Sequence, residues 1–157
     1  MATIKKKPSG YGQFGGFSPY GNVTALAFFL ATNASGAVID SDTTVAVASG
    51  DVIDLGELPE GMRLDDAQIL IKTGMTATVT GSLGFKYVDG DSTEVPQDAA
   101  YFINAGDLAT AGRLRANTGK LVTLPKAARL TLTTGGAANA KASDIKVIVS
   151  GELTGPR

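Results

Sequence analysis

Short runs in which apolar and polar residues alternate dominate the chain from Val23 onward. An alternation with a period of two residues is typical of β-strands that bury one face. Gly, Asp, Asn and Pro separate the runs and favour tight turns. The predicted strands are Val23–Ala31, Thr43–Ala48, Asp51–Leu58, Asp65–Thr73, Ala77–Val88, Ala99–Ile103, Lys120–Leu124, Ala128–Thr134 and Asp144–Leu153.

Two of these runs predict how a strand is buried. Val23–Ala31 is almost continuously apolar, which favours a strand covered on both faces. In Ala77–Val88 the alternation assigns every second residue to one of two faces of the strand. The residues expected to share one face are Val79, Gly81, Leu83, Phe85 and Tyr87.

The connections complete the expected fold. Asp89–Asp91 (DGD) predicts a tight hairpin turn, and the small-residue loop 135–143 predicts a hairpin between the last two strands. Gly106–Arg115 is the one stretch compatible with a helical turn. Eight or nine strands at short, regular spacing indicate an all-β chain: a single antiparallel β-sandwich, jelly-roll-like, with an extended N-terminal arm.

The first 22 residues differ from the rest of the chain. Residues 9–22 (SGYGQFGGFSPYGN) are rich in glycine and carry four regularly spaced rings, those of Tyr11, Phe14, Phe17 and Tyr20. Glycine and proline at this density disfavour helix and strand interior alike. We therefore divide the chain into a Gly/aromatic-rich arm, residues 1–22, and a β-sandwich domain, residues 23–157. The arm either packs on its own sandwich or contacts a partner.

Composition and charge narrow the function. The 157 residues suit one domain, and none of them is histidine or cysteine, so the commonest general base, metal ligand and nucleophile are missing. Three of the 14 basic residues are Lys5, Lys6 and Lys7, which leaves 11 against 15 acidic residues, a net charge of −4, in the rest of the chain. We expect no cofactor. We also expect no nucleic-acid binding, because this part of the chain is acidic, and no membrane span, because its apolar runs are too short.

Three polar clusters remain as candidate sites. Asp89–Glu94 holds three carboxylates, but their spacing is not that of a calcium loop, and a solvated turn is the favoured interpretation. Asp65 and Asp66 are adjacent in a strand, so their side chains point apart and do not form a catalytic pair. Arg113 and Arg115 form a loosely basic stretch that suits either a protein interface or a solvated loop.

Several segments resemble a known group of proteins. These are 58–67 (LPEGMRLDDA), 105–112 (AGDLATAG), 130–137 (LTLTTGGA) and 145–153 (IKVIVSGEL). They resemble small virion proteins of tailed bacteriophages, and among those the chain is most similar to head decoration (cement) proteins with jelly-roll-like folds. The resemblance covers residues 23–157 and consists of loose patterns of small residues.

The resemblance implies a non-enzymatic structural role. Such a protein is made in the host cytoplasm and binds the outer surface of the assembled capsid, where it bridges capsomers. Its partners would be the major capsid protein and further copies of itself, as a homodimer or homotrimer. The candidate interaction residues are Lys5, Lys6, Lys7, Tyr11, Phe14, Phe17, Tyr20, Arg113 and Arg115.

Two other classes of function stay open. A carbohydrate- or receptor-binding β-sandwich of a phage or bacterial surface structure would have the same strand pattern. Sugar sites usually present aromatic platforms, and this chain has no tryptophan and only six aromatic residues outside the arm. An enzyme that works with carboxylates alone is the third class. Genes for portal, protease or major capsid proteins beside the gene would favour the virion protein.

Overall fold

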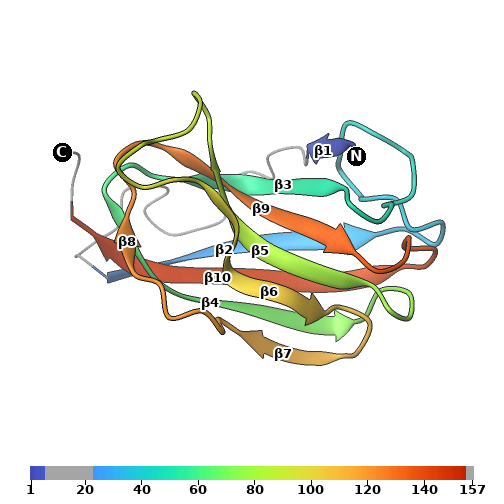
Figure 1. The fold of residues 1–157 in the computed structure, drawn as a ribbon. Helices are drawn as coiled ribbons and strands as arrows, with labels where there is room; N and C mark the ends of the chain where they lie inside the picture. The colour runs from blue at the N-terminus through green and yellow to red at the C-terminus, as the bar shows by residue number, and fades with distance from the viewer. Residues whose placement is uncertain (6–22, 155–157) are drawn as a thin grey trace.

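The computed structural model describes residues 1–5 and 23–154, and their strands form two sheets. The first sheet has the order β1 (Thr3–Lys5), β3 (Val52–Leu58), β9 (Ala128–Gly135), β5 (Thr80–Tyr87) and β6 (Asp98–Asp107). The second has the order β2 (Val23–Thr32), β10 (Ser143–Leu153), β4 (Met62–Thr73) and β7 (Gly112–Arg115), with the short β8 (Val122–Thr123) also on β4. Figure 1 shows β10 running between β2 and β4.

The strand order is that of a jelly roll, as the sequence predicted. If β1 and β8 are set aside, the remaining strands can be counted from first to eighth along the chain. The second sheet then reads first, eighth, third, sixth, and the first sheet reads second, seventh, fourth, fifth. The chain passes between the sheets at almost every connection, so strands distant in sequence become neighbours (Figure 1). This double-sheet arrangement is the jelly roll found in viral capsid and lectin domains.

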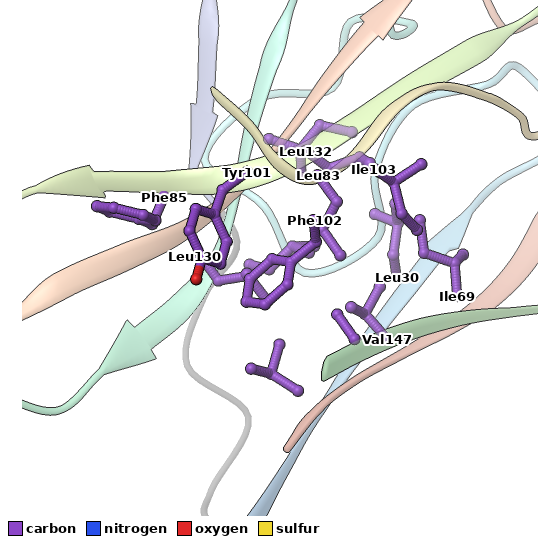
Figure 2. Close-up of a cluster of buried hydrophobic side chains, with 14 of the residues drawn as sticks. Leu30, Ile69, Leu83, Phe85, Tyr101, Phe102, Ile103, Leu130, Leu132 and Val147 are labelled. Carbon is purple, nitrogen blue, oxygen red and sulfur yellow. The ribbon is translucent and has the colours of Figure 1, made fainter. Parts of the chain in front are cut away.

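The core lies between the two sheets and is almost entirely apolar. Side chains from both sheets converge around Phe102, among them Leu30, Leu130 and Val147 (Figure 2). The ring of Tyr101 contacts the rings of both Phe85 and Phe102 edge to face, with centroids 5.3 and 4.7 Å apart. Burial of such side chains is the main driving force for folding. The prediction that five alternate residues share a face is confirmed, because Val79, just before β5, and Gly81, Leu83, Phe85 and Tyr87 within it are all buried.

Strand β2 is not covered on both faces, contrary to the expectation for Val23–Ala31. It lies at the edge of its sheet and pairs with β10 on one side. Leu26 and Leu30 face the core, whereas Val23 on the outer face is 78% exposed. The apolar run therefore reflects an uncharged outer face rather than complete burial.

Two predicted elements are absent. Thr43–Ala48 is not a strand: residues 33–51 form a loop in which Ala46 makes only an isolated bridge to Ala37. Gly106–Arg115 is not helical, because β6 continues to Asp107 and β7 begins at Gly112. The Asp107 carboxylate accepts the N–H of Ala109 at 2.8 Å and so stabilises a turn between two extended strands.

The predicted hairpin at 135–143 is also wrong. Strands β9 and β10 lie in different sheets, and the loop crosses from one sheet to the other. The Asp89–Asp91 turn does connect two antiparallel strands, β5 and β6, but it forms part of a longer loop over residues 88–97. Loop composition marked both turns correctly, but it did not identify which strands pair.

The first residues of the chain contribute an edge strand to the sandwich. Thr3–Lys5 form β1, which pairs in parallel with Val52–Asp54 of β3. Ile4 is only 3% exposed and belongs to the core, so the first residues of the expected arm are part of the sheet. The rest of the expected arm, residues 6–22, lies outside the described residues.

Candidate interaction surface

The outer face of the sheet β2-β10-β4-β7 presents alternate side chains of four adjacent strands. The strand register aligns Phe29 with Lys146, Lys146 with Leu70, and Leu70 with Arg113. The next row along the strands consists of Ala27, Ile148, Gln68 and Arg115. The face thus runs from small and apolar residues on β2 to arginines on β7.

The two predicted arginines extend over the neighbouring strand. Arg113 donates from Nη1 to Oε1 of Gln68 at 2.8 Å, and Arg115 lies 3.0 Å from the Asp66 carboxylate. The Arg115 side chain is 60% exposed, so its ion pair is of the weak surface kind. A guanidinium group has five N–H donors and both arginines are exposed, so each can also bind a partner's carboxylate.

The middle of the face combines cations with apolar surface. The ammonium of Lys146 lies 5.3 Å from the centroid of the Phe29 ring, a cation–π distance. Asp144 and Lys72 form an ion pair at 3.2 Å beside it. These residues, together with Leu70 and Arg113, line a shallow hollow in the surface.

The other predicted interaction residues separate into two groups. Lys5 is exposed on β1, in the other sheet, and its backbone N–H donates to the carboxylate of Asp42 at 3.0 Å. It therefore does not share a surface with Arg113 and Arg115. The remaining candidates lie outside the described residues: Lys6, Lys7, Tyr11, Phe14, Phe17 and Tyr20.

The acidic clusters have structural partners. Asp65 is paired with Arg63 at 2.6 Å, and Asp66 is paired with Arg115, as expected of two side chains that do not converge. Asp91 accepts two backbone N–H groups within its own loop. Over residues 1–5 and 23–154, no three acidic side chains gather in a way that could hold a metal ion. The same residues contain no helix that is long and apolar enough to cross a membrane.

Sequence inspection missed most of this surface. Phe29 was not singled out because its apolar run was expected to be covered on both faces, and Leu70, Gln68 and Lys146 were not because only the presence of their strands was predicted. The outward positions of two strands became one row only when β10 was found between β2 and β4. The signal that could have identified them is the alternate set of residues on each predicted strand.

Comparison with solved structures identifies chains of the same fold in three bacteriophage capsids. A chain in the capsid of Ralstonia phage GP4 matches with a TM-score of 0.65 and 18% identity, covering 99% of both chains. A chain in the acid-stable capsid of Helicobacter pylori bacteriophage KHP30 matches with a TM-score of 0.53 and 15% identity, covering 85% of this chain and 91% of that one. A chain in the capsid asymmetric unit of cyanophage Pam1 matches with a TM-score of 0.54 and 15% identity, covering 94% of this chain and 97% of that one.

At these identities the comparisons show a shared fold. No protein-family model and no curated protein matches the sequence. The match to the Ralstonia phage chain extends over nearly the full length of both, so the jelly roll is shared as a whole rather than as a few strands.

Proposed function

We propose that this chain is a non-enzymatic structural protein of a bacteriophage virion that binds the outside of the capsid and bridges neighbouring capsomers. The observation that carries the proposal is the jelly roll shared over 99% of both lengths with a chain of the Ralstonia phage GP4 capsid. A sequence with no histidine and no cysteine is consistent with a role in binding rather than in catalysis.

The outer face of the sheet β2-β10-β4-β7 is the part of the sandwich that we assign to contact with capsid protein. It offers arginines, which are enriched at protein interfaces, beside apolar surface. We assign a second contact to the aromatic residues of the arm, since buried rings contribute strongly to interface energy. Many copies on one lattice would add such contacts together through multivalency.

A binding experiment with particles of the encoding virus tests the role. Purified chain is added to capsids that lack it, and bound copies are counted after sedimentation. Replacing Arg113 and Arg115 with alanine should weaken binding by about tenfold or more, because arginines that become buried in an interface are common hot spots of binding energy. Lys86→Ala is the matched control, since Lys86 is an exposed cation on the opposite sheet.

The arm is tested separately, by substitution rather than deletion, so that β1 is kept. Serine at all four ring positions, Tyr11, Phe14, Phe17 and Tyr20, should also reduce binding while the melting temperature stays within a few degrees of the wild type. Absence of the chain from mass spectra of purified virions would refute the structural role. Saturable binding to a host glycan, with no binding to capsids, would support the carbohydrate- or receptor-binding alternative instead.

A further inference from the structure

Two cations on the outer face of the sheet β2-β10-β4-β7 have no carboxylate partner within the described part of the chain. Arg113 of β7 donates to the neutral side chain of Gln68. The ammonium of Lys146 of β10 lies over the ring of Phe29. None of the ion pairs formed by the described residues includes either cation. The positive charges of Arg113 and Lys146 are therefore not matched by an acidic side chain on this surface.

The neighbouring charges on the same face are matched. Arg115 pairs with Asp66 at 3.0 Å, and Lys72 pairs with Asp144 at 3.2 Å. Of the four arginines in the described part of the chain, Arg113 is the one that lacks a carboxylate. The unmatched positive charge is therefore confined to one row of the face.

The two arginines of β7 make the same cross-strand contact with different groups. Arg115 faces Gln68 in the strand register and reaches two residues back along β4 to Asp66. Arg113 faces Leu70 and reaches two residues back to Gln68. An amide oxygen accepts a hydrogen bond from the guanidinium, as a carboxylate does, but it leaves the positive charge uncompensated. Arg113 is thus held in position while its charge stays available to a partner.

The rest of the chain cannot supply the missing acidic side chains. Residues 6–22 and 155–157 contain no Asp and no Glu. A side-chain carboxylate for Arg113 or Lys146 therefore has to come from another molecule.

Arg113 and Lys146 flank an apolar side chain. In the strand register Leu70 lies between them, opposite Lys146 on one side and Arg113 on the other. Neighbouring strands are about 4.8 Å apart, so the two cations extend from positions about 10 Å apart. All three residues line the shallow hollow of this face. A partner that fits the hollow would present carboxylates on either side of an apolar side chain.

We propose that this hollow binds an acidic segment of the capsid protein, with one carboxylate on Arg113, one on Lys146 and an apolar side chain on Leu70. The guanidinium binds a carboxylate through two parallel N–H donors, and the ammonium binds as a point charge. Covering Leu70 adds the burial of apolar surface to these contacts. A nucleic-acid backbone would match the two charges but offers no apolar group for Leu70. The inference rests on the proposed function, since it names the chemistry of the capsid segment that meets the assigned face.

The isolated protein tests the chemistry of the hollow without capsids. The probe is the capped peptide Glu-Ser-Leu-Ser-Glu, whose three larger side chains share one face of an extended backbone, and the control peptide is Gln-Ser-Leu-Ser-Gln. In nuclear magnetic resonance titrations the acidic peptide should bind about fivefold or more tightly than the control, because it forms two additional ion pairs. It should shift the amide signals of Lys146, Leu70 and Arg113, and leave that of Lys86 on the opposite sheet unchanged.

Gln68→Glu is the most specific variant, because it changes an amide into a carboxylate of the same shape. Arg113 then gains the kind of ion pair that Arg115 already has, so the acidic peptide should bind about fivefold more weakly. Arg113→Gln should have a similar effect, since it removes the cation itself. The matched control is Gln97→Glu, the same chemical change at an exposed position in the loop between β5 and β6, which should leave the affinity unchanged.

The same variants then test the capsid as the partner. On capsids that lack the chain, Gln68→Glu and Arg113→Gln should weaken binding about fivefold or more, whereas Gln97→Glu should not. If wild type and Gln68→Glu bound capsids equally, the proposed function would stand and this inference would fail. If the acidic peptide bound selectively but the wild type did not bind capsids, the proposed function would fail and the hollow would have a different acidic partner.

Three further results would overturn the proposal. The first is equal affinity for the acidic peptide and its Gln control. The second is tighter binding of a short single-stranded DNA than of the acidic peptide, which would assign the hollow to phosphates. The third is self-association of the wild type that Gln68→Glu abolishes, which would assign the hollow to a second copy of the chain.

Discussion

Asn139 joins three connections of the chain at one end of the sandwich. It is 1% exposed, and its Oδ1 accepts the N–H of Thr76 at 3.0 Å. Its Nδ2 donates to Oγ1 of Thr32 at 3.0 Å and to the carbonyl of Lys141 at 2.9 Å. A buried polar group that has all its hydrogen bonds fixes the geometry around it, and here it holds the end of β2, the β4–β5 connection and the β9–β10 crossover together.

Asn139→Ala should lower the free energy of unfolding by about 2–3 kcal/mol, because it leaves buried donors and acceptors without partners. Asn104→Ala is the control, since Asn104 is exposed on β6, and should change stability by less than about 0.5 kcal/mol. Urea denaturation measures both values. Equal stability of the two variants would mean that the buried network contributes nothing.

Asp91 organises the loop between β5 and β6. Its Oδ1 accepts the N–H of Gln97 at 2.7 Å and the N–H of Ser92 at 2.8 Å. These hydrogen bonds favour the charged form and lower the pKa of Asp91 below its usual value of 3.8. On the other side of the loop, Lys126 donates to the carbonyl of Gly90 at 2.8 Å.

The lowered pKa of Asp91 sets a pH dependence of stability. A carboxyl with a lower pKa in the folded state contributes stability above 3.8, and this contribution is lost as the pH falls through the folded value. The melting temperature of Asp91→Ala should therefore be lower than that of the wild type at neutral pH. The difference between the two melting temperatures should disappear as the pH drops below 3.8. Asp89→Ala, whose side chain makes none of these bonds, should show no such convergence. A gap that persisted at low pH would exclude the carboxylate as its source.

At the level of elements, β1 is, like β7, a strand that the sequence did not predict. It is three residues long and has a single apolar residue, Ile4, so it offers no alternation to recognise. Parallel pairing with β3 and the buried carboxylate of Asp51, which accepts the N–H of Ala2 at 3.0 Å, place it in the sheet. Both partners lie about fifty residues away along the chain.

Ile4→Ala should destabilise the protein by about 2–4 kcal/mol, because it removes buried apolar volume and leaves a cavity. Thr3→Ala, at an exposed position of the same strand, should have little effect. Thermal melts of the two variants distinguish these outcomes. If Ile4→Ala had the same melting temperature as the wild type, β1 would not contribute to the stability of the sandwich.

The positions of the longer strands were predicted well, whereas the pairing between strands was not. β3, β4, β5, β9 and β10 were recognised to within a few residues, because alternation is a local property of the chain. The helical turn near Gly106 and the hairpin at 135–143 were wrong because short polar stretches are compatible with several structures. Only the pairing of β7 with β4, and of β10 with β2 and β4, decided between them.

For the whole molecule, the fold depends on pairing between distant segments. The second strand, β2, pairs with the last, β10, and β3 pairs with β9. Such pairs form only after long loops close, which costs conformational entropy before the contacts repay it. The jelly roll is thus a topology of high contact order.

Refolding should therefore take milliseconds to seconds, as in other β-sandwiches, rather than microseconds. Tyrosine fluorescence in stopped-flow experiments can follow it, since Tyr87 and Tyr101 become buried in the core. Microsecond refolding would show that local contacts dominate the transition state, contrary to this topology.

The sequence alone determined the all-β class, the positions of most strands, the residues that share the buried face of β5, and the lack of the usual catalytic side chains, because all of these follow from composition and local periodicity. Only the tertiary structure decided that Arg113 and Arg115 lie in two adjacent rows with residues of β4 and β10, that Lys5 lies on the other sheet, and that β2 is an edge strand. Those facts depend on which strands are neighbours. A strand's own pattern shows which face it buries, but its neighbours are selected by the packing of the whole chain.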